Sequence, residues 1–145
     1  MIQLVRIIDD LPGDFERLQA EAAADGHRHI EQLDQDWNSG TQRFAGDGEA
    51  LLTAYQGGEL VGLGAISREP SKITEPTIRL RRLFVSPGAR RNGVARTIVA
   101  ALVQEGFDNA ALLTAHAGDA TAIGFWEAQG FQPVAGQAWS HELRR

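Results

Sequence analysis

The segment that most constrains the fold runs from Leu80 to Arg96, where an apolar strand passes through a Ser-Pro-Gly turn into a helix. The first turn of such a helix leaves backbone N–H groups unpaired, and the positive end of the helix dipole lies there. Gly93 lacks a side chain, so a phosphate group can approach the backbone closely. Arg90 and Arg91 supply positive charge nearby. The segment predicts a site for a small polyanion or, alternatively, a solvated arginine-rich face.

The overall charge argues against a nucleic-acid partner. The chain has 145 residues and a formal net charge of -5, which would repel a nucleic-acid backbone. Six arginines nevertheless fall between positions 79 and 96. A local positive patch on an acidic protein favours a small polyanion over DNA or RNA.

Composition also limits the chemistry and the location. Cysteine is absent, which excludes disulfides, thiolate metal ligands and a thiol nucleophile. No apolar run approaches the roughly 20 residues of a membrane helix, and the first residues show no export signal. We therefore expect a cytoplasmic protein with no membrane partner. The length matches one ordinary domain, so we expect a single domain over residues 1–145.

Hydrophobic periodicity and turn residues divide the chain into strands and helices. We expect strands at 3–8, 50–56, 60–68, 77–85 and 110–116, and two closing strands at about 131–134 and 138–143. We expect helices from Asp9 or Asp10 to Gly26, from about His27 to Gly40, between Gly93 and Gly106, and at 120–129. The predicted fold class is α/β, a mixed sheet of about six to seven strands flanked by helices.

Other cofactor patterns are weak in this sequence. Gly62 and Gly64 lie inside a strand rather than between a strand and a helix, which favours close backbone packing over dinucleotide binding. No P-loop string is present, which disfavours a nucleotide-binding protein. His27 and His29 lie two residues apart on a predicted helix and should point in different directions, so no metal site is expected.

Two motifs carry a resemblance to a known family. Arg90-x-x-Gly93-x-Ala95 follows a strand and opens a helix, and Phe125-Trp126-Glu127-x-x-Gly-Phe comes after a further strand. This arrangement resembles the Gcn5-related N-acetyltransferase (GNAT) family, which has Gln/Arg-x-x-Gly-x-Gly/Ala and commonly Phe-Tyr-Glu-x-x-Gly-Phe. The motifs cover about residues 79–131, and the order of elements agrees over nearly the whole chain. The resemblance implies the acyl-CoA N-acyltransferase fold.

The resemblance also implies acetyl-coenzyme A (acetyl-CoA) as cosubstrate. By similarity, the pantetheine arm would bind backbone groups of Leu83, Phe84 and Val85. The residues that would surround the pyrophosphate are Arg90, Arg91, Gly93, Val94, Ala95 and Arg96. Phe125 and Asp119 complete the implied cofactor contacts. Asp119 stands where the family often has Asn, and a carboxylate cannot donate the hydrogen bond that an amide donates.

The catalytic groups depart from the family pattern. Trp126 stands where the family often has a tyrosine general acid, and an indole N–H does not release a proton near neutral pH. Trp126 therefore either shapes the acyl pocket or belongs to the core. Arg79 stands where some members have a glutamate base. His116 ends a strand and is either a base or a surface or packing histidine.

Four upstream residues are open to two interpretations. Trp37, Arg43 and Phe44 either form an acceptor pocket or are structural, and the structural role is favoured. Glu49 either attracts a cationic amine or simply begins a strand.

The leading hypothesis is an acetyl-CoA-dependent N-acetyltransferase that moves an acetyl group by direct transfer to an amine of a small molecule or peptide. The serines show no nucleophile-elbow pattern, so no covalent enzyme intermediate is expected. The alternative is a non-catalytic acyl-CoA-binding or regulatory module, which the missing tyrosine favours. The expected partner is the amine acceptor, and a homodimer is left open.

Overall fold

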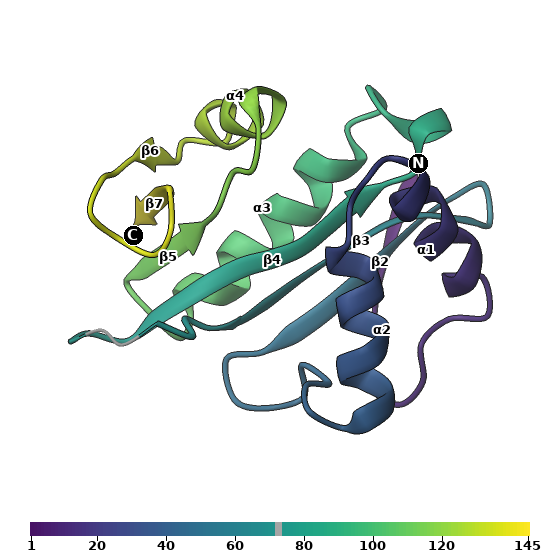
Figure 1. Cartoon of the computed structure of the whole chain (residues 1–145), viewed down its shortest axis with the longest axis horizontal. Helices are drawn as coiled ribbons and strands as arrows, with labels where there is room; N and C mark the ends of the chain where they lie inside the picture. Colours follow the sequence, from purple (N-terminus) through teal and green to yellow (C-terminus); the bar gives the residue numbers. More distant parts are fainter. Residues whose placement is uncertain (72–73) are drawn as a thin grey trace.

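The computed structural model describes residues 1–71 and 74–145 (Figure 1). The strands are β1 (Ile2–Arg6), β2 (Ala50–Gln56), β3 (Glu59–Arg68), β4 (Thr77–Val85), β5 (Leu112–Ala115), β6 (Gln132–Pro133) and β7 (His141–Arg144). The helices are α1 (Phe15–Ala24), α2 (His29–Ser39), α3 (Val94–Phe107) and α4 (Ala120–Ala128), with a short 3-10 helix over Pro87–Ala89. No helix among the described residues is both long enough and apolar enough to span a membrane.

The seven strands form one sheet in the order β1-β2-β3-β4-β5-β7-β6. Strands β4 and β5 pair in parallel, and every other neighbouring pair is antiparallel. The connection from β4 to β5 runs through α3, as parallel pairing requires. The predicted mixed α/β sheet flanked by helices is confirmed.

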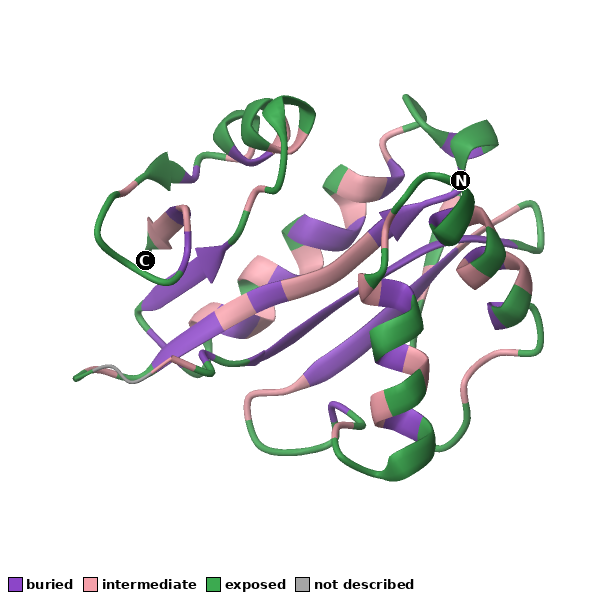
Figure 2. Cartoon of the chain, viewed as in Figure 1, coloured by how far each residue is buried: buried purple, intermediate pink, exposed green. Residues whose placement is uncertain are grey.

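The helices cover opposite faces of the sheet (Figure 1). One apolar cluster includes Leu18 of α1 and Trp37 of α2, and lies on one face. A second cluster on the other face includes Ile98 of α3 and Trp126 of α4. Figure 2 shows the buried residues concentrated on the strands and on the sheet-facing sides of the helices. Each helix thus buries one apolar stripe, as its 3.6-residue periodicity predicts.

The glycines of β3 serve close packing against α3, as expected. A Cβ at Gly64 would lie 2.8 Å from Cγ2 of Ile98, and a Cβ at Gly62 would lie 3.0 Å from the backbone oxygen of Phe84. The distance at Gly64 is shorter than real Cβ contacts, and the distance at Gly62 is tighter than most of them. The two glycines therefore allow α3 to approach the sheet.

The boundary between α1 and α2 differs from the prediction. His27 was expected to begin the second helix, but its N–H donates to the oxygen of Ala22 (2.9 Å), while the N–H of Gly26 donates to the oxygen of Ala23 (3.0 Å). Gly26 has φ +79°. These bonds form a capping motif at the end of α1, so His27 belongs to that cap and α2 begins at His29.

The first helix also begins later than predicted. The N–H of Phe15 donates to the oxygen of Pro12 (3.0 Å), which closes a turn before the helix. Helix α1 then starts at Phe15 rather than near Asp9 or Asp10.

Candidate functional site

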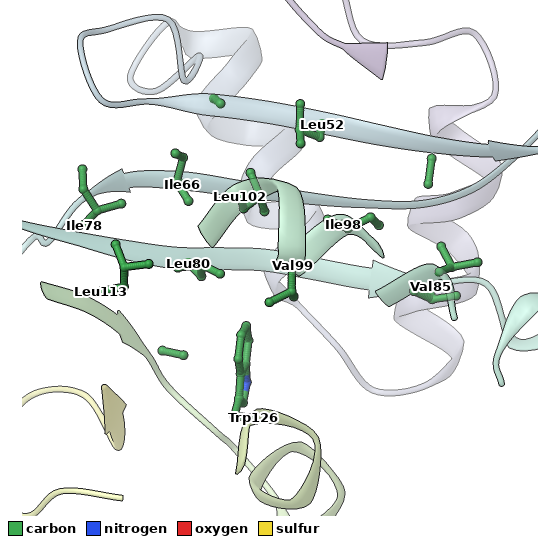
Figure 3. Close-up of a cluster of buried hydrophobic side chains, with 14 of the residues drawn as sticks. Leu52, Ile66, Ile78, Leu80, Val85, Ile98, Val99, Leu102, Leu113 and Trp126 are labelled. Atoms are coloured by element: carbon green, nitrogen blue, oxygen red, sulfur yellow. The ribbon is translucent and has the colours of Figure 1, made fainter. Parts of the chain in front are cut away.

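Strands β4 and β5 separate partway along the sheet. They pair only from Thr77 to Arg79 on β4, opposite Leu112 to Thr114 on β5, whereas β4 continues to Val85. In Figure 3, the strand that carries Leu113 diverges from β4 toward Trp126. Among the residues that the structure describes, the second half of β4 therefore has no strand partner on its β5 side.

The backbone groups that face this open side belong to Leu83 and Val85. The N–H of Ser86 donates to the oxygen of Val61 on β3 (2.8 Å), so Ser86 faces β3. Residues of a strand direct their backbone groups alternately to either side, and Phe84 therefore also faces β3. Leu83 offers its N–H and C=O groups and Val85 its N–H group to an extended ligand, which could bind as an added strand. The oxygen of Val85 already accepts from Arg90.

A β-bulge alters β4 just before these groups. Leu63 pairs with Phe84 and Ala65 pairs with Arg81, so two β4 residues lie opposite one residue of β3. One of the two, Arg82, has φ +59°, which is uncommon for a residue with a side chain. Bulges re-aim side chains and interrupt pairing beside functional sites.

The start of α3 lies next to the open edge. Gly93 precedes the helix with φ +81°, and the first N–H groups of α3 have no intrahelical partner. A cavity of about 360 Å³ opens here. Its lining residues come from the end of β4, the turn, α3 and α4: Val85, Ala89, Arg90, Arg91, Gly93, Val94, Ala95, Arg96, Phe125 and Gln129.

Eight of the eleven predicted cofactor residues line this cavity. The other three are Leu83, Phe84 and Asp119. Leu83 lies on the open strand edge beside the cavity, whereas the Phe84 ring is buried in the cluster under α1 and α2. Asp119 caps α4 by accepting a hydrogen bond from the N–H of Ala122 (2.8 Å). That carboxylate therefore has a structural role.

The arginines of the turn are not equivalent. Arg90 donates to the backbone oxygen of Val85 (3.2 Å), forms an ion pair with Asp25 and lies 5.6 Å from the centre of the Phe84 ring. Arg91 and Arg96 make no hydrogen bond or ion pair with any other described residue. Their guanidinium groups are available to a polyanion, while that of Arg90 already has partners.

The two predicted catalytic residues lie outside the cavity lining. Trp126 is buried and contacts Phe125 and Phe131 edge-to-face, and Figure 3 shows its ring extending toward Val99 of α3. This position corresponds to the core alternative. His116 is exposed just after β5, and within the described residues it has no hydrogen-bond partner.

Sequence reasoning missed a buried polar network where β4 meets β5. The carboxylate of Glu69 accepts from Arg79 Nε (2.7 Å), from the hydroxyl of Thr114 (2.8 Å) and from the N–H of Ser71 (2.9 Å). Burial raises the pKa of Glu69, but these donors outweigh burial and hold its pKa below the usual value. Glu69 is thus an ionised structural carboxylate. The β3–β4 hairpin brings Arg79 to Glu69, and the pairing of β4 with β5 brings Thr114 to the same carboxylate.

A second missed network joins α4 to β7. His141 is buried, with Nε2 2.9 Å from Glu127 Oε2 and Nδ1 2.8 Å from Ser140 Oγ. The Ser140 hydroxyl also accepts from the N–H of Ala117 (2.8 Å). No local sequence motif predicts this cluster, because α4, β7 and the loop after β5 meet only in the folded chain. These hydrogen bonds link β7 to α4 and to the loop after β5.

The contacts of the four upstream candidates support a structural role for them. Trp37 and Phe44 are core residues under the sheet. Arg43 Nε donates to the backbone oxygen of Trp37 (2.9 Å). Glu49 accepts from Gln42 (3.0 Å) and from the N–H of Gly46 (2.9 Å), which shapes the loop before β2.

The expected divergence of His27 and His29 is wrong. Their ring centres lie 5.5 Å apart, because His27 precedes α2 instead of sharing its helical rotation. Burial, with repulsion from His27 and Arg82, lowers the pKa of His29 to about 4. No cluster of three metal-ligating side chains occurs among residues 1–71 and 74–145.

Comparison with known proteins identifies the fold and family. The family model described as "Acetyltransferase (GNAT) family" matches residues 7–131. The chain belongs to this family. The match confirms the resemblance seen in the two motifs. GNAT proteins are acetyl-CoA-dependent acetyltransferases that act on amine acceptors. No curated protein sequence matches the chain significantly.

Solved structures support the fold. A protein from Exiguobacterium sp. 255-15, assigned as an acetyltransferase, has a TM-score of 0.88 at 23% identity and covers 99% of this chain and 93% of that one. A ribosomal-protein-alanine N-acetyltransferase from Brucella melitensis has a TM-score of 0.69 at 22% identity, with 99% of both chains covered. A variant of the AtaT toxin bound to acetyl-CoA and the C-terminus of the antitoxin AtaR has a TM-score of 0.74 at 15% identity, covering 99% of this chain and 92% of that one.

The residues at the open edge fit the cofactor that the family uses. A free strand edge suits the amide-containing pantetheine arm. A helix start with a glycine in the left-handed region leaves room for a pyrophosphate. Arg91 and Arg96 line the cavity there and supply positive charge that no other described residue pairs.

Proposed function

We propose that this chain, as one N-acetyltransferase domain over residues 1–145, transfers the acetyl group of acetyl-CoA directly to an amine of a small molecule or peptide. The observation that carries the proposal is the open edge of β4, which begins after Arg79 and leads into the Gly93 turn. The open strand edge thus leads directly to a helix start that can bind an anion. Acetyl-CoA has the matching layout, because its extended pantetheine arm carries the thioester at one end and the pyrophosphate at the other.

In this proposal the protein holds acetyl-CoA through its backbone. Leu83 and Val85 pair with the pantetheine amides, and the first N–H groups of α3 bind the pyrophosphate. Arg91 and Arg96 neutralise its charge. Phe125 closes the cavity from the side of α4.

The chemistry needs little from the side chains. A neutral amine attacks the thioester carbonyl carbon, the carbon–sulfur bond breaks and the thiolate departs. A backbone N–H of β4 near Phe84 polarises the carbonyl oxygen. A thiol has an ordinary pKa of about 8.5, so its anion leaves readily near neutral pH and solvent can protonate it.

The amine must lose a proton on the way to the amide. His116 is our candidate for the base because it is exposed just after β5, the strand that flanks the opening. Solvent is the alternative acceptor of that proton. His116→Ala separates the two: a base role predicts a fall in kcat, whereas a surface role leaves it unchanged.

The competing function is a non-catalytic acyl-CoA-binding module. The buried indole at Trp126 favours it, because no phenol stands at that position to protonate a leaving thiolate. Both functions require acetyl-CoA binding, so turnover must decide between them.

The test combines binding with turnover. Calorimetry should show binding of acetyl-CoA and none of ATP, and free thiol should be released in the presence of amines, amino acids or peptides. Acetyl-CoA binding without acceptor-dependent thiol release from any of these would favour the binding module. Absence of acetyl-CoA binding would contradict both functions.

A further inference from the structure

Three arginines of β4 lie on the sheet face that α1 and α2 cover. Arg81 pairs with Ala65, which belongs to the apolar cluster under those helices. Arg79, two residues away along the strand, shares that face. Arg82 lies next to Asp36 of α2, because the bulge keeps it on the same side as Arg81. We call Arg79, Arg81 and Arg82 the β4 arginine cluster.

The carboxylates around this cluster leave two of its arginines without a charge-assisted hydrogen bond. Arg79 is paired with Glu69 at 2.7 Å. Arg82 Nη2 is 3.8 Å from Asp36 Oδ2, which is beyond hydrogen-bond distance. Arg81 donates to the neutral hydroxyl of Ser67 at 3.3 Å and forms no ion pair with any described residue. Asp36, Glu49 and Glu69 attract Arg81 only from beyond ion-pair distance. Arg81 and Arg82 therefore keep guanidinium donors that no described carboxylate engages at hydrogen-bond distance.

Arg82 provides a second indication that a ligand binds here, because part of its side chain lacks a hydrogen-bond partner among the described residues. Its side chain is 12% exposed, and its Nε is buried with no hydrogen-bond partner among the described residues. Leaving a buried charged donor unpaired is costly. The residue also takes the left-handed backbone conformation at φ +59°. Strain of this kind is found at ligand-binding and catalytic sites.

The titration of neighbouring groups agrees with a positive local potential. Burial, followed by repulsion from another arginine of the cluster, lowers the pKa of both Arg81 and Arg82. Repulsion from Arg82 also contributes to the low pKa of His29. His29 is therefore neutral at neutral pH and does not add to the charge.

The cluster lies close to the proposed point of transfer. Arg82 directly precedes Leu83, whose backbone groups face the open edge. Residues of a strand are spaced by about 3.3 Å, so a small molecule can reach both a guanidinium of the cluster and a thioester held at Leu83. The cofactor's own phosphates would lie at the far end of the edge, beside Gly93.

We propose that the acceptor is an amine that also carries an anionic group, a carboxylate or a phosphate, and that Arg81 and Arg82 bind this group. The proposal rests on the acetyltransferase function proposed above and deepens it. A guanidinium matches either anion with two parallel hydrogen bonds. The same guanidinium groups would repel an acceptor whose far end is cationic, such as a polyamine.

The test uses four short amines of similar length. Butylamine has an apolar end, γ-aminobutyrate a carboxylate, aminopropylphosphonate a phosphonate and putrescine a second ammonium. The kcat/KM of each amine is measured by thiol release. At least one anionic amine should have a kcat/KM about tenfold or more above that of butylamine, because a hydrogen bond to a charged group contributes a binding free energy of that size. Putrescine should be the poorest of the four.

Variants then assign the preference to the cluster. Arg81→Met and Arg82→Met should each raise KM for the anionic amine by about tenfold or more, with little change in kcat or in kcat/KM for butylamine. Arg68→Met is the matched control, because Arg68 pairs with Ile78 of the opposite, α3-facing cluster. It removes the same charge and should leave the anionic amine's KM unchanged. Circular dichroism checks that each variant is folded.

The outcomes separate this inference from the proposed function. A preference for butylamine or putrescine, or an anion preference that survives both substitutions, overturns the anionic acceptor and leaves acetyltransfer intact. If acetyl-CoA binds but no amine is acetylated, the anion site is tested by binding instead. Calorimetry then measures the affinity of aminopropylphosphonate for the protein saturated with coenzyme A. Binding that Arg81→Met abolishes supports the anion site, and no binding overturns it.

Discussion

Arg79 Nε lies 2.7 Å from Glu69 Oε1 at the last position where β4 pairs with β5. The same carboxylate oxygen accepts from the hydroxyl of Thr114, the β5 residue opposite Arg79. Glu69 therefore joins both strands where they begin to separate. The open edge of β4 starts directly beyond this ion pair.

The first prediction is that Glu69→Gln destabilises the protein by about 3 kcal/mol at neutral pH, because it leaves Arg79 without its buried carboxylate. The pKa of Glu69 is lowered in the folded state from an ordinary value of 4.5. Its contribution is thus fully present above that value and is lost as pH falls through the lower, folded pKa. Urea unfolding should show the parent and the variant converging in acid.

Glu75→Gln is the matched control for this prediction. Glu75 pairs with Arg144 (2.9 Å) at an exposed position, and exposed pairs contribute little. Its unfolding midpoint should stay near that of the parent. An equal effect of the two substitutions would show that the Glu69 network does not hold the strands.

The second prediction concerns the turn that begins α3. Gly93→Val should lower acetyl-CoA affinity by about tenfold or more, because the side chain occupies the approach to the helix start. It should also cost about 1–2 kcal/mol of stability, since φ is +81° at this position. Calorimetric titration and thermal unfolding measure the two effects.

Gly88→Val gives the comparison within the same turn. A Cβ at Gly88 meets nothing within 4 Å, and its φ is not positive. Its acetyl-CoA affinity should stay within about twofold of the parent, as expected for a surface change away from the site. Identical affinities for both glycine variants would place the pyrophosphate elsewhere.

The third prediction separates the arginines of the turn. Arg91→Gln and Arg96→Gln should weaken acetyl-CoA binding and reduce its dependence on salt, because both side chains are free to meet a polyanion. Arg90→Gln should instead lower the melting temperature, since it removes the hydrogen bond to the backbone of Val85 and the contacts with Asp25 and the Phe84 ring. Titrations at several salt concentrations and unfolding scans distinguish these results. Salt-independent binding in the parent would mean that the arginines are only a solvated face.

The fourth prediction tests whether Trp126 acts in chemistry. Trp126→Phe should keep kcat within a few fold, because the residue packs between α4 and α3 (Figure 3). Trp126→Ala should cost about 3–5 kcal/mol of stability through the cavity it leaves. A large fall in kcat for the phenylalanine variant, with normal stability, would instead place the indole at the reacting atoms.

The sequence by itself determined the local parts of the site. The strand, the Ser-Pro-Gly turn, Gly93 and the start of α3 are consecutive, so their spacing predicted an anion site that the structure forms as a cavity. The bounds of β2 and β4 were predicted in full, and most other elements differ from the prediction only at their ends. Apolar periodicity and glycine positions suffice for these features because they depend on neighbours along the chain.

The tertiary structure alone decided how distant residues meet. The pairing of β4 with β5 brings Glu69 to Thr114, and the pairing of β5 with β7 brings His141 to the loop that precedes α4. The bulge at Arg82 places two successive arginines on one face. A strand's register and irregularities are set by packing across the sheet rather than by its own sequence. For that reason the polar networks and the β4 arginine cluster emerged only when the strands were paired.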